Sequence, residues 1–236
     1  MKYRHIMFSM IKNSHRGAIN DIKFVPKTVK VDKKNPNDNV YAHIATCAED
    51  GMILIWDSRH VSKEKWREEN AKNKDVIWEP FQKIQLYRRD GTGELGLTWI
   101  LFWKDQTDTF IWCSSDEGDL VMIDWSVKPP GDQKKGLQAK KEDVIIDYIL
   151  QYYESERNFR PVLELARSPF YEDLLLTVHD FYFCIWKTSL RDYEAPIFRS
   201  SYTQNGSNTC GAFSPTRPGV IFITKTTGID IWDFVD

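Results

Sequence analysis

The stretch Ile53-Leu-Ile-Trp-Asp57, a short apolar run that closes on a Trp-Asp pair, recurs in related form along this chain. Each copy follows another apolar run and a turn, so each indicates a pair of antiparallel strands. The related stretches are Leu-Val-Met-Ile-Asp-Trp (120–125), Phe-Cys-Ile-Trp-Lys (183–187) and Ile-Asp-Ile-Trp-Asp (229–233). Four copies of one strand pair predict a repeat architecture built from small β-sheets.

Strand pairs with this ending are the signature of WD40 repeats, in which one repeat makes a four-stranded blade of a β-propeller. We therefore predict an all-β fold, a WD40 β-propeller with four recognisable blades and with helical and loop insertions. The repeats fall at residues 14–59, 83–126, 160–189 and 200–236.

Three insertions lengthen the spacing between repeats, at residues 27–39, 60–80 and 127–158. The first is rich in Lys and Asn and predicts a solvated hairpin insertion. The second is charged and rich in helix formers, which predicts an exposed helical linker. The third ends in apolar residues at helical spacing over 142–157, so we predict a helix there and take Ile145 and Ile149 as candidate partner contacts.

The first repeat contains the four side chains that often tie a WD40 blade together: a His from the entry loop, a Ser or Thr, a turn Asp and the closing Trp. They are His15, Thr46, Asp50 and Trp56. Buried polar groups persist only when they are hydrogen-bonded, so these four are expected to form one network.

The other repeats depart from this set. The second has Ile123 at the Trp position, the third has Thr177 one place out of register and no entry His, and the fourth shortens its turn. We expect the full network in the first repeat alone. The residues predicted to close the other blades are Trp125, Asp180, Trp186, Trp232 and Asp233.

Composition places the chain among globular proteins. Its 236 residues are 42% hydrophobic and 28% charged, with a net charge of −2, so nothing in the charge indicates a nucleic-acid partner. No apolar run approaches the ~18 residues of a membrane helix, and residues 1–8 are too polar for a secretory signal. The four cysteines are widely spaced and do not form a zinc motif, so we expect buried free thiols and an intracellular protein.

The sequence offers little for catalysis, so we predict no enzyme, no cofactor and no metal. Gly91-Thr-Gly-Glu-Leu-Gly96 matches a dinucleotide-binding pattern but lies between strand-like segments, which favours a Gly-rich hairpin. His43 and His179 are interpreted as hydrogen-bonded structural histidines. Phosphate-binding-loop and nucleophile-elbow motifs do not occur in the sequence.

Longer stretches of the sequence resemble a known protein family. Residues 167–187 contain Arg-Ser-Pro-Phe-Tyr-Glu-Asp-Leu-Leu-Leu-Thr-Val, and residues 214–220 read Ser-Pro-Thr-Arg-Pro-Gly-Val. With residues 45–59 and 114–125, they resemble four successive blades of dynein intermediate chains. Residues 91–98 are most like the axonemal intermediate chains of the two-headed inner-arm dynein.

Two departures from this family are visible. His179 stands where the family has Gly, and four blades are recognisable where the family has about seven. The family's N-terminal extension that binds light chains has no counterpart in this sequence. Because an open propeller exposes strand edges, we expect either a piece of a longer polypeptide or a second chain that completes the ring.

The resemblance implies a non-catalytic subunit of an axonemal dynein. Its propeller would bind the N-terminal tail of the dynein heavy chain, alongside other intermediate and light chains, and help to anchor the motor. The implied location is the cytoplasm and cytoskeleton, in the axoneme of a cilium or flagellum, with no membrane and no nucleic acid bound. The alternatives are a general WD40 adaptor, such as a ubiquitin-ligase substrate receptor, and an enzyme with a site in the propeller channel.

Overall fold

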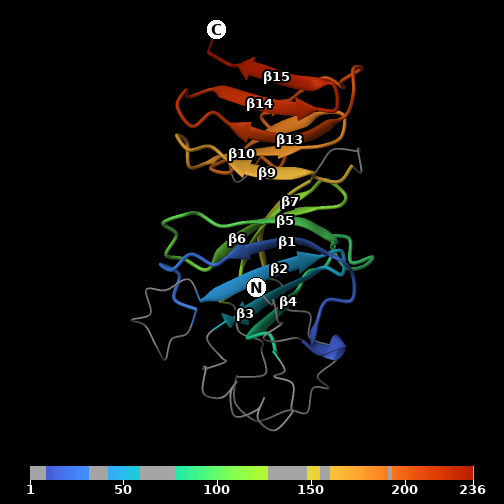
Figure 1. Ribbon diagram of the computed structural model, residues 1–236, viewed down its shortest axis with the longest axis vertical. Coiled ribbons are helices and arrows are strands. Elements are labelled where there is room, and N and C mark those ends of the chain that lie inside the picture. Colours follow the sequence, from blue (N-terminus) through green and yellow to red (C-terminus); the bar gives the residue numbers. More distant parts are fainter. Residues whose placement is uncertain are drawn as a thin grey trace, which may run out of the picture. The chain divides into compact units, whose positions relative to one another are not determined.

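The computed structural model describes residues 9–31, 42–58, 78–126, 148–154, 160–190 and 193–235. The chain divides into two compact units, 1–108 and 109–236. Its strands form four antiparallel sheets of three or four strands (Figure 1). Among the described residues the one helix is a short 3-10 turn, η1 (Ile11–Asn13). The predicted all-β fold is confirmed.

The first unit contains the first sheet and one further strand. The sheet has the order β1 (Ile19–Phe24), β2 (His43–Ala48), β3 (Met52–Asp57) and β4 (Gln82–Gln85). The fifth strand, β5 (Leu97–Leu101), lies against β1 and β2, and its Ile100 N–H donates to the Asp21 carboxylate at 3.1 Å. The outer strand β4 follows the long linker, so the first sheet is completed by residues distant in sequence.

The turn between β2 and β3 depends on Gly51. This residue has φ +67°, and a Cβ there would lie 2.9 Å from the carbonyl oxygen of Leu86. Both features exclude a side chain, because L-residues rarely adopt positive φ and backbone cannot move aside cheaply. The Gly51 carbonyl also accepts a hydrogen bond from Leu86 N–H at 2.9 Å. The Asp50-Gly51 turn thus also holds the segment that follows β4.

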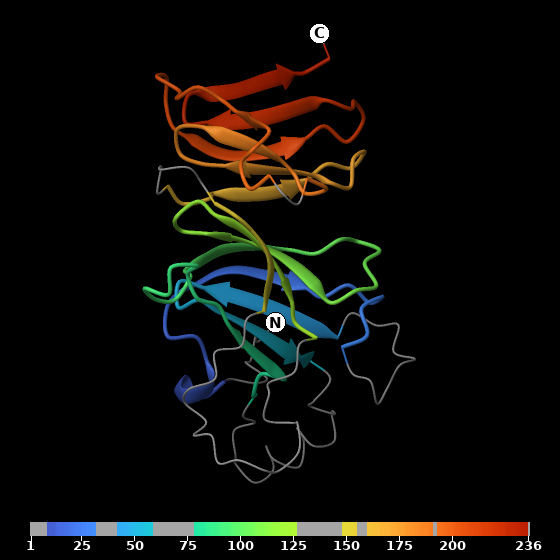
Figure 2. The same ribbon diagram turned by 180° about the vertical axis from the view of Figure 1, so that it is seen from behind.

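The second unit contains the remaining strands, seen from two sides in Figures 1 and 2. The second sheet contains β6 (Phe110–Ser115), β7 (Leu120–Asp124) and β8 (Ile149–Tyr153) as successive antiparallel strands. The third contains β9 (Glu164–Arg167), β10 (Leu174–Val178), β11 (Phe183–Lys187) and β12 (Phe198–Arg199). The fourth contains β13 (Asn208–Phe213), β14 (Val220–Lys225) and β15 (Gly228–Asp233).

The helix predicted over residues 142–157 is wrong in its described part. Ile149–Tyr153 is the strand β8, in which Ile149 pairs with Ile123 and Tyr153 with Leu120 of β7. Branched and aromatic residues suit a strand, and pairing with β7 overrides the helical spacing. Ile145 and the helical linker predicted for the second insertion lie outside the described residues.

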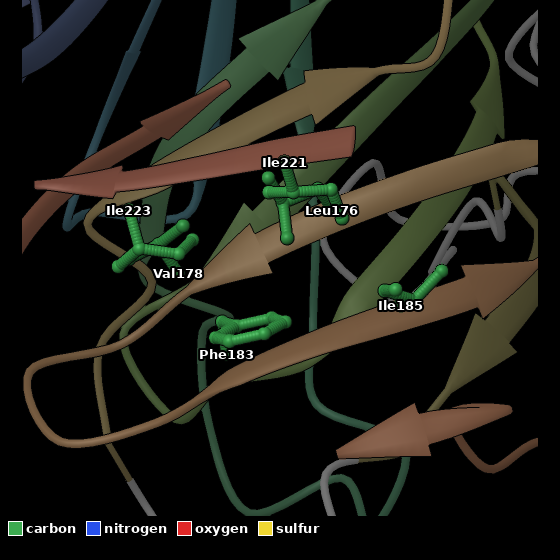
Figure 3. Close-up of a cluster of buried hydrophobic side chains, with 6 residues drawn as sticks. All are labelled: Leu176, Val178, Phe183, Ile185, Ile221 and Ile223. Atoms are coloured by element: carbon green, nitrogen blue, oxygen red, sulfur yellow. The ribbon is translucent and has the colours of Figure 1, made fainter. Parts of the chain in front are cut away.

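The third and fourth sheets share an apolar core. The third sheet contributes Leu176, Val178, Phe183 and Ile185, and the fourth contributes Ile221 and Ile223, all buried (Figure 3). Gly211 of β13 permits this packing, because a Cβ there would lie 2.6 Å from Val178 Cγ2. One face of each sheet is therefore covered by the other.

Candidate functional site: hydrogen-bond networks across the strands

The four side chains predicted from the first repeat lie together in the first sheet. The Trp56 indole N–H donates to Thr46 Oγ1 at 2.9 Å, and His15 Nε2 lies 2.8 Å from the same oxygen. His15 Nδ1 lies 3.2 Å from Asp50 Oδ1. Because a carboxylate accepts, Nδ1 carries the proton in the neutral ring, and Nε2 accepts from the Thr46 hydroxyl. The hydrogen bonds therefore run in one direction, from Trp56 to Asp50.

Asp50 also fixes the backbone around it. Its carboxylate accepts the N–H of Arg16 at 2.7 Å and the N–H of Met52 at 3.0 Å. Burial alone raises the pKa of Asp50, but these N–H donors and the His15 ring outweigh it and hold the pKa below its usual value. The ionised Asp50 thus joins the entry loop to the β2–β3 turn.

The third sheet repeats the Thr–Trp bond in the same strand register. The Trp186 indole N–H donates to Thr177 Oγ1 at 2.9 Å. Thr46 and Thr177 each lie two residues beyond the residue that pairs with the tryptophan of the next strand. The prediction that Thr177 is out of register is wrong. The turn that follows it is one residue shorter than in the first sheet, since Thr177 precedes Trp186 by nine residues and Thr46 precedes Trp56 by ten.

A histidine completes the network of the third sheet, although this repeat has no entry histidine. His179 Nε2 lies 3.1 Å from Thr177 Oγ1, and His179 Nδ1 lies 3.0 Å from the carbonyl oxygen of Arg160. A carbonyl accepts, so Nδ1 again carries the proton and the chain runs from Trp186 to Arg160. Among the described residues, the full set of His, Thr, turn Asp and Trp therefore occurs in the first repeat, and the third forms a shorter Trp–Thr–His chain that ends on a backbone carbonyl.

His179 is fully buried and neutral. Burial lowers the pKa of His179 to about 4, and its ring stacks on Tyr182 with ring centroids 4.2 Å apart. The sequence carried a signal for this role: His179 follows Thr177 by two residues, which places both side chains on one face of a strand. That spacing identifies His179 as a structural histidine.

The predicted blade-closing aspartates lie outside these networks. Asp180 Oδ2 pairs with the guanidinium of Arg160 at 3.1 Å, and Asp233 Oδ2 accepts from the guanidinium of Arg217 at 2.9 Å. Both pairs are partly exposed, so each contributes at most about 1 kcal/mol. In the third sheet, His179 bonds Thr177, and the next residue, Asp180, pairs with Arg160.

The fourth sheet has an apolar residue at the threonine position. Trp232 pairs with Ile221, and the residue two positions beyond is Ile223, which is buried in the shared core. Thr224, the next residue of β14, points to the other face and bonds the Thr209 hydroxyl at 2.9 Å. The fourth sheet therefore stabilises its centre by apolar packing.

The second sheet uses a different polar contact. Ile123, at the position of the closing tryptophan, is fully buried, and Trp125 is buried with its backbone N–H donating to Thr109 O at 3.2 Å. The hydroxyl of Tyr152 in β8 donates to Asp119 Oδ2. Burial, together with the carboxylate of Asp119, raises the pKa of Tyr152. This bond ties the outer strand to the β6–β7 turn.

The two Ser-Pro strings form equivalent turns. Ser168 Oγ accepts the N–H groups of Phe170 and Tyr171, and Ser214 Oγ accepts those of the residues at 216 and 217. In both turns the serine hydroxyl accepts the backbone N–H groups two and three residues further along the chain, as serine commonly does in turns. The strings that carry the family resemblance are thus local turn chemistry.

The Gly-rich segment and the cysteines were also predicted from the sequence. Residues 87–94 form a hairpin in which Arg88 N–H donates to Gly93 O at 3.0 Å, so the Gly-rich hairpin is confirmed. Cys47, Cys113 and Cys184 are buried free thiols, whereas Cys210 is exposed.

Ile149 is half-buried in β8, and its role as a partner contact stays a prediction. His43 Nε2 lies 3.5 Å from Asp57 Oδ2, inside the first sheet.

Within the described ranges, three or more His, Cys, Asp or Glu side chains are nowhere grouped so that they could hold a metal ion. The described part of the chain also contains no helix whose length and hydropathy would let it cross a membrane.

Comparisons with known proteins give one consistent family. The family model described as dynein axonemal intermediate chain 3 WD40 domain matches residues 1–106 and 94–236. Dynein axonemal intermediate chain 3 of Danio rerio is 25% identical, over 98% of this chain and 29% of that protein. The Homo sapiens protein of the same name is 24% identical, over 100% of this chain and 32% of its own length.

A related protein, dynein axonemal intermediate chain 2 of Mus musculus, is 42% identical over 79% of this chain and 25% of its own length. The chain therefore spans about a third or less of the length of these relatives. The family model, in contrast, matches the chain from its first residue to its last. The chain thus belongs to the family of the dynein axonemal intermediate chain 3 WD40 domain, and its sheets are WD40 blades.

Proposed function

We propose that this chain is a non-catalytic subunit of an axonemal dynein, and that its propeller blades form a scaffold for the N-terminal tail of the dynein heavy chain. The observation that carries the proposal is the match of the intermediate-chain WD40 model along the whole chain. Relatives named axonemal dynein intermediate chains support the axoneme of a cilium or flagellum as the location.

The geometry of the polar residues supports a scaffold. The hydrogen-bonded histidines His15 and His179 lie inside sheets and use both ring nitrogens in contacts within the protein. A catalytic base needs a ring nitrogen within reach of substrate. These networks therefore suit blades that hold their shape while a partner binds to the outside.

The finer proposal is an inner-arm dynein, assembled with other intermediate and light chains. It rests on the likeness of residues 91–98 to inner-arm chains. In this role the chain supports assembly and anchoring of the arm for ciliary motility, while ATP hydrolysis takes place on the heavy chain.

Affinity capture from ciliary extract tests the proposal. The tagged chain is incubated with extract, and bound proteins are quantified by mass spectrometry against a tagged WD40 protein from outside the dynein family. We expect heavy chain and other intermediate chains to be enriched on this chain alone. Recovery of ubiquitin-ligase subunits without a motor would contradict the proposal and favour the general adaptor.

The candidate contact at the outer strand β8 is tested in the same assay. Ile149→Asp is expected to lower heavy-chain recovery if β8 faces the heavy chain. Ser189→Ala, in the turn after β11, is the control. Circular dichroism shows whether each variant keeps its strands. Undiminished recovery with Ile149→Asp would remove β8 from the interface.

A further inference from the structure

A small pocket lies between the third and fourth sheets, on the face of the fourth sheet that the third sheet covers. Phe183 and Ile223, both from the shared core in Figure 3, are among its lining residues. Its other walls come from β13, β14, β15 and the loop 200–203. Its volume is about 190 Å³, which suits one side chain and is below the ~300 Å³ at which small-molecule sites begin.

This pocket lies at the position that the polar network occupies in the first sheet. The inner strands β1 and β13 have the same bulge after their first residue, which aligns Ile19 with Asn208. His15 precedes Ile19 by four residues, and Gln204 precedes Asn208 by the same number. The side chain of Gln204 is exposed and does not line the pocket. The entry loop of the fourth sheet therefore does not fill the place that His15 fills in the first.

Two polar groups of the pocket have no hydrogen-bond partner among the described residues. Asn208 is 4% exposed, and its Nδ2 donates to two backbone carbonyls of the β10–β11 turn at 2.9 and 3.2 Å. Those bonds fix the amide, so its buried Oδ1 is left as an acceptor without a donor. The Trp232 indole N–H, unlike those of Trp56 and Trp186, has no threonine to bond. A ligand that satisfies both groups is favoured, because a buried polar group without a bond is costly.

The walls of the pocket suit a flat, neutral ligand. The rings of Phe183 and Trp232 are 5.0 Å apart between centroids and form an aromatic wall. The two charged residues that line the pocket, Lys225 and Asp230, form an ion pair with each other. The charges of this pair cancel, so the pocket favours neither an anion nor a cation.

The networks of the first and third sheets show which group meets these requirements. His15 and His179 each use one ring nitrogen as donor and the other as acceptor. The ring of His179 also stacks on Tyr182. A neutral imidazole thus combines a donor for Asn208 Oδ1 and an acceptor for the Trp232 N–H on one flat ring.

We propose that the pocket between the third and fourth sheets binds a histidine side chain of a partner protein. The ring in its neutral form donates to Asn208 Oδ1, accepts from the Trp232 indole N–H and packs beside Phe183. The ring comes from another molecule because the chain's own entry loop carries Gln204, which lies outside the pocket. The proposal is separate from heavy-chain binding, since it concerns one pocket of the purified chain.

Fluorine NMR of the whole chain labelled with 5-fluorotryptophan tests the proposal, with imidazole as the probe. The pH is about 8, where an imidazole ring is mostly neutral. The Trp232 signal is assigned by its loss in Trp232→Phe. It is expected to shift saturably, with half-saturation at about 10 mM or below, as befits so small a ligand. The signals of Trp56 and Trp186 should stay in place, because their N–H groups are already bonded.

Loss of the buried acceptor is the first variant test. Asn208→Ala is expected to weaken imidazole binding about tenfold, since one hydrogen bond to the ring is lost. Asn205→Ala, the same change at an exposed position of the entry loop, is the matched control and should bind as the native chain does. Thermal unfolding shows whether Asn208→Ala keeps its fold without the bonds to the β10–β11 turn.

A second variant leaves Asn208 intact. Gln204→His places a histidine in the entry loop at the position of His15. Its ring is expected to enter the pocket, shift the Trp232 signal without any probe and abolish the response to imidazole. Gln204→Ala is the control and should respond as the native chain does. A Gln204→His chain that still binds imidazole normally would contradict the proposed place of the ring.

Two further probes identify the ligand chemistry. A blocked Ser-His-Ser peptide is expected to shift the Trp232 signal, and a blocked Ser-Ala-Ser peptide is not. Acetamide, which has a donor and an acceptor but no ring, should bind at least about tenfold more weakly than imidazole. A Trp232 signal that imidazole leaves unchanged, or native affinity in a folded Asn208→Ala, overturns the proposal. Binding of imidazole without the histidine peptide, or equal binding of acetamide, overturns it as well.

Discussion

The first and third blades share a Trp–Thr–His hydrogen-bond chain, but the histidine comes from a different part of the sequence in each. In the first, the histidine comes from the entry loop, 31 residues before its threonine. In the third, His179 follows Thr177 by two residues and its other nitrogen bonds a backbone carbonyl. The constant part is the Thr–Trp bond in a fixed strand register. These two blades thus share the polar chain across their strands, and its histidine can come from more than one part of the sequence.

The fourth blade is built without this polar chain. Ile223 stands at the threonine position, and Trp232 packs among the rings of Phe183, Phe198 and Phe234. Where the threonine is absent, apolar and aromatic packing stabilises the blade. The comparison predicts that the first and third blades respond to loss of a histidine, each within its own sheet.

The largest effect is expected for His179→Ala. The variant removes a fully buried, stacked ring and leaves the Thr177 hydroxyl without one partner. Cavity and lost hydrogen bonds together should cost about 3–4 kcal/mol of unfolding free energy. Hydrogen exchange read by mass spectrometry should show faster exchange in β10 and β11. Unchanged exchange there would contradict the role of His179.

A pH series tests the same residue without a cavity. The pKa of His179 is about 4 in the folded chain, below the usual ~6.5 of an unfolded histidine. The unfolded chain therefore binds a proton first, so the stability from neutral His179 is complete above pH ~6.5 and falls as pH drops to ~4.

The loss should reach about 3 kcal/mol at the acid end. Urea unfolding at several pH values gives the free energy of unfolding as a function of pH. Between pH 4 and 6.5 this free energy should change less steeply with pH for His179→Gln than for the native chain. An equal pH dependence in the two proteins would exclude His179 as the cause of the stability loss at low pH.

In the first blade, His15→Ala and Asp50→Ala are expected to cost about 1–3 kcal/mol each, because each leaves a buried partner without its bond. Exchange should rise in β2 and β3, with β10 and β11 unchanged. Asp50→Asn, which keeps one acceptor oxygen, should lose less. Normal thermal unfolding of both alanine variants would show that the four-residue chain contributes little.

The smallest effect is expected for Ile223→Thr, which gives the fourth blade the threonine of the third. The variant loses apolar contact in the shared core, but its hydroxyl can accept the Trp232 indole N–H, so the net cost should be about 1 kcal/mol. Thermal unfolding measures it, and Ile221→Thr, opposite Trp232, is the control. A larger loss for Ile223→Thr than for the control would show that the position does not accept a polar bond.

The fold could be predicted from the sequence because the strand pairs, the Trp endings and the Asp50-Gly51 turn are local signals. It failed where pairing between distant strands decides the structure. Residues 149–153 read as a helix until β7 is present as a partner. Thr177 looked misplaced because its position was counted from Asp180, and that count changes with the length of the turn between the two strands. Its position relative to the partner of Trp186 on the neighbouring strand does not depend on the turn. His179 was correctly interpreted as a structural histidine, but its partners could not be named because its bonds depend on that same register.

The most direct test of the account is cross-linking of the chain inside isolated axonemes, followed by mass spectrometry. Exposed lysines such as Lys27 and Lys104 lie in the turns that follow β1 and β5 and are open to the reagent. The account predicts cross-links from the blades to the N-terminal tail of a dynein heavy chain. Cross-links to ubiquitin-ligase subunits, with none to a heavy chain, would contradict it.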